Sequence, residues 1–148
     1  GKTLAYLVPI ISTLLRHKQR LAERAASGDD ANDVVRERKA HALVLCPNFT
    51  LCRQVQAVAD MLRGADGVPL LSTACVNASS PPPQDAPDII VSTPAALVGF
   101  LNEAGPRYGW LWSPEGMEAK VRHVVLDEAD LMLTKAFSKP VKQLMQLL

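Results

Sequence analysis

Three residues at the start of the chain have the types and order that phosphate binding requires. Gly1, Lys2 and Thr3 match the end of the pattern G-x-x-x-x-G-K-[ST]. In that pattern a glycine lets the backbone approach the anion, a lysine reaches the β- and γ-phosphates, and a hydroxyl binds Mg²⁺. A helix that begins here would direct its positive end at the same anion. Three residues also suit an ordinary helix start, so a second signal is needed.

The second signal is a pair of carboxylates near the other end of the chain. Asp127 and Glu128 directly follow the apolar run 121–126, which is typical of a buried strand. A carboxylate at a strand end can hold Mg²⁺ through water, and a neighbouring carboxylate can orient or deprotonate an attacking water. The alternative is a helix N-cap with an acidic first turn. Together with the glycine-lysine-threonine run, the pair predicts nucleotide binding.

The hydrophobic pattern predicts alternating helices and strands that would position these residues. Helical spacing of apolar residues occurs in the segments 4–15, 51–62, 94–103 and 137–148, and we expect Pro9 to bend the first helix. Apolar runs predict strands at 42–46, 68–76, 88–92 and 121–126. Strict alternation predicts an α/β fold with a mainly parallel sheet flanked by helices. In such sheets, ligands bind at the carboxyl ends of the strands.

Two polar or irregular segments interrupt the pattern and are interpreted as loop insertions, near 27–39 and 104–119. The second contains Trp110 and Trp112, which could stack on bases but are interpreted first as anchors that pack on the domain. Residues 81–83 are three consecutive prolines, which cannot form the interior of a regular element.

Composition sets limits on the class of protein. The chain has 148 residues, 48% hydrophobic and 21% charged, with a formal charge of +1. These values indicate one globular domain and exclude a disordered chain or a polybasic tail. No apolar run reaches the roughly 18 residues of a membrane span, so no membrane partner is expected. Cys46, Cys52 and Cys75 form no C-x-x-C pair and are expected to be reduced, which favours an intracellular protein in the nucleus, the cytosol or an organelle.

Several charged residues are given no role in chemistry. The basic residues of the first helix are predicted to form a solvated helix end, with RNA binding as the alternative: Arg16, His17, Lys18, Arg20 and Arg24. The three histidines, His17, His41 and His123, share no metal-ligand spacing. Asp88 has no partner that the sequence identifies.

Four segments resemble, in order, the motifs of the DEAD-box ATP-dependent RNA helicases. Residues 127–130 read D-E-A-D, and residues 1–10 are similar to G-K-T-x-A-[FY]-x-x-P-[IL]. Residues 90–94 resemble the strand-to-helix turn in which the family has the motif T-P-G-R. Residues 47–54 are similar to the motif P-T-R-E-L-A-x-Q. The resemblance covers nearly the whole chain. It implies that residues 1–148 are part of the first RecA-like domain, a P-loop NTPase fold, truncated at both ends.

The resemblance also implies a role for each matching residue at the nucleotide. Gly1, Lys2 and Thr3 would bind ATP, and Thr3 and Asp127 would hold Mg²⁺. Glu128 would polarise the hydrolytic water as the catalytic residue.

Further roles are implied for RNA binding and for domain closure. Pro47, Gln54, Thr93 and Pro94 would contact RNA, mostly through its phosphate backbone. Asp130 would couple the nucleotide site to a second RecA-like domain outside this chain. A protein cofactor is a further possible partner.

Departures from the family pattern fall in the RNA-contacting motifs. Asn48-Phe49-Thr50 stands where the family has threonine, arginine and glutamate, and Ala95-Ala96 stands where it has glycine and arginine. Val76-Asn77-Ala78 occupies the place of a double glycine. Each lost phosphate contact should weaken RNA binding and flatten its salt dependence.

Three functions therefore compete. The leading hypothesis is an ATP-hydrolysing RNA helicase or RNA-remodelling ATPase, with this chain inactive and poorly stable on its own. The first alternative is a degenerate, non-catalytic RNA-binding scaffold, which the departures favour and the intact nucleotide residues oppose. The second is a P-loop ATPase without an RNA role, which leaves the matches at Thr93 and Asp130 unexplained.

Overall fold

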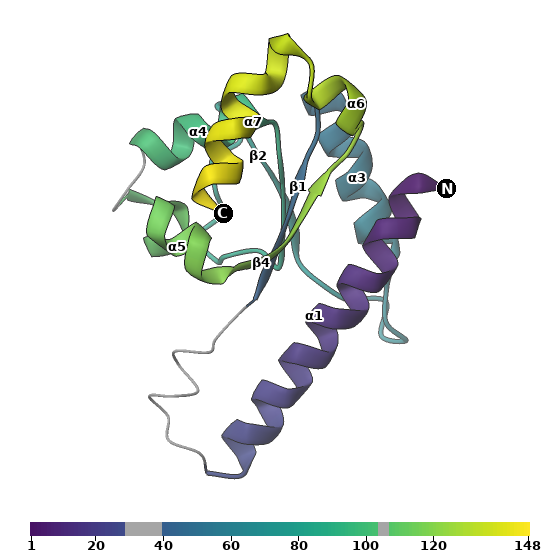
Figure 1. Ribbon diagram of the computed structural model, residues 1–148. Coiled ribbons are helices and arrows are strands. Elements are labelled where there is room, and N and C mark those ends of the chain that lie inside the picture. The colour runs from purple at the N-terminus through teal and green to yellow at the C-terminus, as the bar shows by residue number, and fades with distance from the viewer. Residues whose placement is uncertain (29–39, 104–106) are drawn as a thin grey trace.

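The computed structural model describes residues 1–28, 40–103 and 107–148, and within them four strands form one sheet in the order β2-β3-β1-β4 (Figure 1). The strands are β1 (His41–Leu45), β2 (Thr73–Val76), β3 (Ile89–Ser92) and β4 (Val121–Leu126). Each pairing in this sheet is parallel. The predicted α/β fold with a mainly parallel sheet is confirmed.

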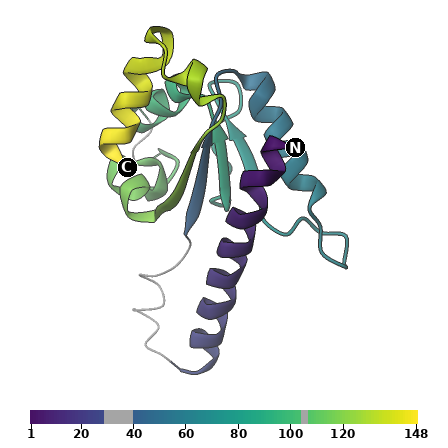
Figure 2. The same ribbon diagram turned by 45° about the vertical axis from the view of Figure 1, so that its right-hand side comes forward.

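Helices cover both faces of the sheet. In the described residues they are α1 (Lys2–Ala26), α3 (Phe49–Met61), α4 (Pro94–Glu103), α5 (Pro114–Lys120), α6 (Ala129–Met132), α7 (Lys135–Leu147) and the 3₁₀ turn η2 (Trp110–Trp112). Figure 2 shows α1 and α3 on one side of the sheet and α4, α5 and α7 on the other. No helix among the described residues is long and apolar enough to cross a membrane.

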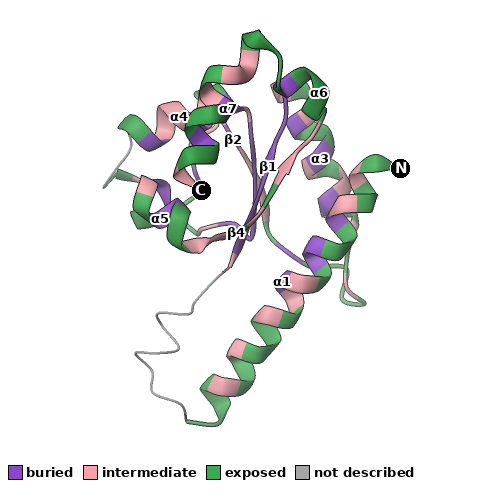
Figure 3. Ribbon diagram, viewed as in Figure 1, coloured by how far each residue is buried: buried purple, intermediate pink, exposed green. Residues whose placement is uncertain are grey.

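Strand β1 lies at the centre of two hydrophobic cores (Figure 3). Its alternate residues Ala42 and Val44 pack beneath α1 and α3, whereas Leu43 and Leu45 pack beneath α4, α5 and α7. Every residue of β1 is buried, as expected of a parallel strand covered by helices on both faces. This packing fixes the height at which each strand ends, and therefore where the residues that follow the strands lie.

Helix α1 is held by an apolar stripe along its first half. Leu7, Ile10, Ile11 and Leu14 are buried against the sheet at helical spacing, and the helix continues through Pro9. Beyond this stripe the helix projects past the sheet, as Figures 1 and 2 show. Its amino end therefore stays at the sheet while its carboxyl end reaches away from it.

The strand predicted at 68–76 is shorter than expected, because β2 begins only at Thr73. A tight turn occupies the preceding residues: Gly67 has φ +75°, and the Asp66 carboxylate accepts from the Val68 amide at 3.0 Å. Pro69 follows and has no amide to offer a ladder. Strict alternation also fails, since no helix separates β2 from β3. Three of the residues between these strands are the prolines 81–83.

The loop insertion predicted near 104–119 is instead largely helical in its described part. Ser113 caps α5 by accepting from the Gly116 amide at 3.0 Å, and Trp112 is buried beside it. Gly116 is required here, because a Cβ atom would lie 1.9 Å from the Trp110 carbonyl oxygen. Trp112 is the packing anchor that the sequence predicted, whereas Trp110 is 57% exposed. Of the other predicted insertion, residues 29–39 lie outside the described part of the chain.

Strand β4 differs from the buried strand predicted at 121–126. It lies at the edge of the described sheet, and its side chains alternate between half-buried and exposed. Val124 is 38% exposed. The apolar pattern of β4 is typical of a buried strand. In the structure, however, no described strand pairs with its outer side, so that side of β4 is an unpaired sheet edge.

Candidate nucleotide site

The amino end of α1 lies next to the carboxyl end of β4, on the side of the sheet where the strands end. The Tyr6 hydroxyl donates a hydrogen bond to Asp127 Oδ2 at 3.0 Å. Thr3 lies one helical turn before Tyr6 on α1. The two parts of the chain that predict nucleotide binding are therefore connected through Tyr6. Sequence reasoning gave Tyr6 no role, although it is the polar-tipped residue on an otherwise apolar helix face.

Tyr6 is a fixed hydrogen-bond donor in this arrangement. Burial raises the pKa of its hydroxyl well above the ordinary value, and the negative charge of Asp127 raises it further. The tyrosine therefore stays protonated at any physiological pH. Because the proton is held on Tyr6, the Asp127 carboxylate acts as the acceptor and keeps one orientation.

The amino end of α1 has the features of an anion site. Gly1 is the N-cap of α1. No acidic residue lies in the first turn, and the first described helical bond runs from the Ala5 amide to the Gly1 carbonyl at 3.2 Å. The preceding amides are thus free of helical bonds and suit a phosphate. Lys2 is exposed beside them and Thr3 is half-buried.

The residues at the end of β4 suit Mg²⁺ that is shared with phosphate and water. Asp127 is held in place by its own amide, which donates to the Leu45 carbonyl at 2.9 Å. Among the described residues no three acidic, histidine or cysteine side chains gather as a metal cage. Mg²⁺ ordinarily binds one or two carboxylates together with substrate phosphates and several waters. Thr3 and Asp127 therefore fit the ion as a partial set of ligands.

Glu128 is in an unusual backbone conformation. Its φ of 55° and ψ of 52° place it in the left-handed region, where it is the only non-glycine residue of the described chain. Such a conformation costs a residue with a side chain about 1–2 kcal/mol. The turn at Glu128 ends β4 and starts α6, and it leaves both Glu128 and Asp130 exposed. Strain of this kind is concentrated at functional sites.

Two cysteine thiols lie within electrostatic reach of Asp127. Cys46 and Cys52 are buried and free. The neighbouring Cys52 side chain, and then burial, raises the pKa of the Cys46 thiol far above its ordinary value. Both thiols act as small core side chains here, as the sequence predicted.

The predicted RNA-contacting residues follow the neighbouring strands β1 and β3. Pro47 comes after β1 and is buried, whereas Gln54 is exposed on α3. Thr93 comes after β3, and its hydroxyl accepts from the Ala96 amide at 3.4 Å. Pro94 begins α4 and is buried. Pro47, Thr93 and Pro94 thus follow the carboxyl ends of the strands, as Asp127 does, and both prolines are buried.

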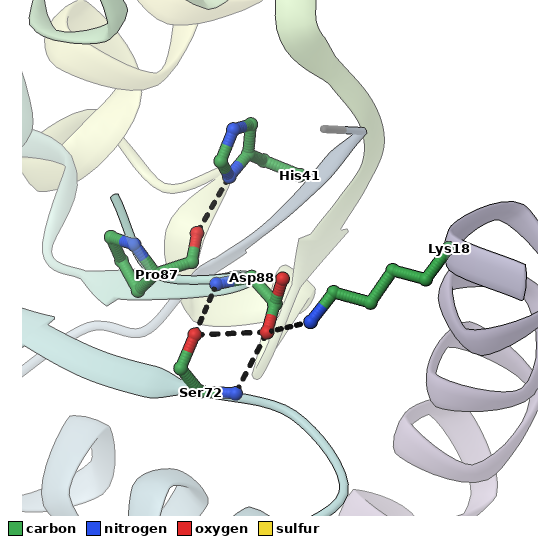
Figure 4. Close-up of polar contacts among 5 residues, drawn as sticks. All are labelled: Lys18, His41, Ser72, Pro87 and Asp88. Atoms are coloured by element: carbon green, nitrogen blue, oxygen red, sulfur yellow. Dashed lines mark hydrogen bonds and ion pairs between the residues drawn. The ribbon is translucent and has the colours of Figure 1, made fainter. Parts of the chain in front are cut away.

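A polar cluster at the amino ends of the strands corrects one prediction and supplies partners for Asp88. Asp88 is 3% exposed and accepts hydrogen bonds from the Ser72 amide and hydroxyl, both at 2.9 Å (Figure 4). Lys18 forms an ion pair with the same carboxylate oxygen at 2.8 Å. Asp88 therefore has partners, and Lys18 belongs to a contact between α1 and the sheet instead of a solvated helix end. Neither contact could be found in sequence, because the partners are 16 and 70 residues away from Asp88.

The fold and the placement of these residues define an α/β domain of the RecA-like class. The chain belongs to the DEAD/DEAH box helicase family, whose model matches residues 1–148. It is 38% identical over 150 residues to the DEAD-box ATP-dependent RNA helicase 22 of Oryza sativa subsp. japonica, and equally to that of Arabidopsis thaliana. These matches cover all of this chain but 24% of each relative, so the chain spans about a quarter of their length.

A solved structure supports the same fold. The DEAD-box helicase Mss116 bound to ssRNA and UDP-BeF matches with a TM-score of 0.66 at 20% identity, over 99% of this chain and 26% of the other. At this identity the likeness establishes the fold alone. The resemblance noted in the sequence is confirmed by the family match, and the roles of individual residues stay predictions.

Proposed function

We propose that the protein containing this chain is an ATP-dependent RNA helicase or RNA-remodelling ATPase that acts inside the cell. The observation that carries the proposal is the Tyr6–Asp127 hydrogen bond, because it joins the helix end proposed to bind phosphate to the carboxylate proposed to hold Mg²⁺. Family membership supports the same reading, and the relatives are named ATP-dependent RNA helicases.

At the nucleotide, each residue has a task that its position supports. The free amides after Gly1 and the ammonium group of Lys2 bind the β- and γ-phosphates of ATP. Thr3 and Asp127 hold Mg²⁺, and Tyr6 keeps the Asp127 carboxylate in one orientation. When bound, Mg²⁺ neutralises charge on the phosphates. The exposed Glu128 orients the attacking water and accepts its proton.

At the RNA, the binding surface is the edge of the sheet beyond β1 and β3. Thr93 and the amides that begin α4 contact backbone phosphates, with Pro47, Gln54 and Pro94 shaping the same surface. Asp130 couples this domain to a second RecA-like domain, and a protein cofactor is a further partner. Contacts of this type read the phosphate chain without reading base edges, which suits a helicase that accepts many sequences.

The test is ATP hydrolysis by the full-length protein with and without single-stranded RNA, using Glu128→Gln as the blank. We expect RNA to stimulate turnover and the variant to lose at least about 100-fold of it, the usual contribution of a general base. RNA binding without any turnover would instead support the degenerate scaffold. Turnover that RNA does not change would support a P-loop ATPase without an RNA role.

A further inference from the structure

A pocket of about 540 Å³ lies beside the first turns of α4, separate from the nucleotide site. Ala95, Ala96 and Gly99 of α4 line one side of it. Residues that follow β2 close another side, so the pocket opens at the same edge of the sheet as Thr93. Its volume is within the range of small-ligand sites, about 300–1,000 Å³.

The pocket exists because this stretch of α4 carries small side chains. Ala96 stands where the family pattern has an arginine, and a Cβ atom built on Gly99 meets nothing within 4 Å. Glycine in the middle of a helix costs roughly 0.5–1 kcal/mol relative to alanine. No contact at Gly99 explains that cost, since its missing side chain leaves open space and not a close approach.

Aromatic and charged groups line the rest of the pocket. Phe100 and Tyr108 meet edge to face with ring centroids 6.0 Å apart. The guanidinium of Arg107 lies 5.6 Å from the centre of the Tyr108 ring. Glu103 also lines the pocket, so its formal charges balance. Such a pocket does not attract anions by net charge, and it offers one cation and one carboxylate around an aromatic wall.

We propose that this pocket binds one nucleotide of single-stranded RNA, in addition to the contacts that the family motifs predict. The Arg107 guanidinium binds a backbone phosphate, and Tyr108 and Phe100 provide the surface on which the base stacks. Glu103 accepts a hydrogen bond from a ribose hydroxyl or an exocyclic amine. The proposal rests on the proposed RNA function.

The position of the pocket favours RNA over other ligands. The hydroxyl of Thr93, a predicted phosphate contact, accepts from the amide of Ala96, which lines the pocket. A strand that contacts Thr93 therefore passes next to the pocket. This chain has alanine at position 96, where the family motif has arginine. Arg107, later in the chain, places a guanidinium at the pocket instead.

The test measures binding of a fluorescent single-stranded RNA to the full-length protein, with a non-hydrolysable ATP analogue, between about 50 and 200 mM salt. Arg107→Ala should weaken binding at least fivefold and reduce the salt slope by about 0.7, the value for one phosphate contact. Gly99→Leu should fill the pocket, weaken binding by a similar factor and leave the salt slope unchanged. The leucine improves helix propensity, so loss of folding is not expected.

Matched controls separate the outcomes. Arg20→Ala removes an exposed arginine from the projecting part of α1 and should leave RNA binding unchanged. ATP hydrolysis without RNA should be the same in all variants. Unchanged RNA affinity in both pocket variants would overturn the pocket proposal while leaving the helicase proposal intact. If the wild-type protein binds no RNA, both proposals are overturned.

Discussion

Glu128 combines a predicted chemical role with a backbone conformation that disfavours any side chain. Its left-handed φ and ψ follow from the abrupt turn between β4 and α6. A glycine would form this turn at lower cost. The glutamate at this position is therefore retained at the expense of stability, as expected of a residue that is needed for chemistry.

This conflict gives a prediction about two substitutions of the same residue. Glu128→Gly should be more stable than Glu128→Ala by about 1 kcal/mol, because only glycine relieves the left-handed strain. Both variants should lose ATP hydrolysis equally, since both lack the carboxylate. Urea unfolding of the two proteins measures the difference. Equal stabilities would show that the turn is not strained.

Tyr6 is a positioning residue whose effect should appear in the metal dependence. Tyr6→Phe removes the hydrogen bond to Asp127 and keeps the ring in the core. We expect the Mg²⁺ concentration for half-maximal ATP hydrolysis to rise about tenfold, as is usual when a partner of a metal ligand is lost.

The control for Tyr6 is Tyr108→Phe, which removes the other tyrosine hydroxyl of this chain. It should leave the Mg²⁺ dependence unchanged. A Tyr6→Phe protein with an ordinary Mg²⁺ dependence but lower stability would reduce Tyr6 to a structural role.

The sequence predicted which residues would form the candidate site but not how they would be joined. Gly1, Lys2, Thr3 and Asp127 have types that suggest phosphate and metal binding wherever they stand. The bond between Tyr6 and Asp127 depends on the angle at which α1 crosses the sheet. That angle is set by packing along the whole helix, which no local pattern contains.

At the scale of elements, α1 is anchored to the sheet by the cluster around Asp88. Burial alone would raise the pKa of Asp88, but hydrogen bonds from Lys18 and Ser72 outweigh it and hold the pKa below its ordinary value. The ionised carboxylate thus contributes stability above about pH 4, and that contribution is lost as the pH falls through the lowered pKa.

We therefore predict that Asp88→Asn lowers the free energy of unfolding by about 1–2 kcal/mol at pH 7. The Lys18 side chain is 44% exposed, so the ion pair itself supplies only a small part of this loss. The difference from wild type should shrink below pH 4, where the wild-type carboxylate also takes up a proton. Denaturant unfolding at several pH values measures this difference. Asp85 is exposed, so the control Asp85→Asn should change neither the free energy of unfolding nor its pH dependence.

Elements with strong local signals were predicted and those set by tertiary contacts were not. The apolar runs that became β1 and β3 and the periodicity of α3 and α7 gave the right elements. The start of β2 was wrong, because the turn at Gly67 displaces an apolar run from the ladder. Helix α5 was not predicted, although Ser113-Pro114-Glu115 has the residue types of a helix start, because the helix is short and follows an irregular segment.

At the scale of the whole molecule, β4 leaves one edge of the described sheet open. Val124, Leu131 and Leu133 are among the exposed large apolar residues on and after this strand. In a chain limited to residues 1–148, an open edge with apolar side chains nearby would favour association with other chains.

We accordingly predict that residues 1–148 alone are marginally stable and do not hydrolyse ATP. Isolated chain and full-length protein should be compared by thermal unfolding, by size-exclusion chromatography and by turnover. The isolated chain should unfold at lower temperature and tend to aggregate. A monomeric chain that unfolds cooperatively and hydrolyses ATP above the Glu128→Gln level would contradict this prediction.

The two anchors of α1 have a consequence for how the molecule opens. Tyr6 bonds the helix to the residue after β4, where the strands end. Lys18 bonds it to the residue before β3, where the strands begin. The part of α1 between these two contacts is held against the sheet at both ends. Its amides should therefore exchange with deuterium only when the sheet itself opens. Beyond Lys18 the helix extends past the sheet and should exchange rapidly. A nucleotide bound at Gly1 would then slow exchange as far along α1 as the Lys18 anchor.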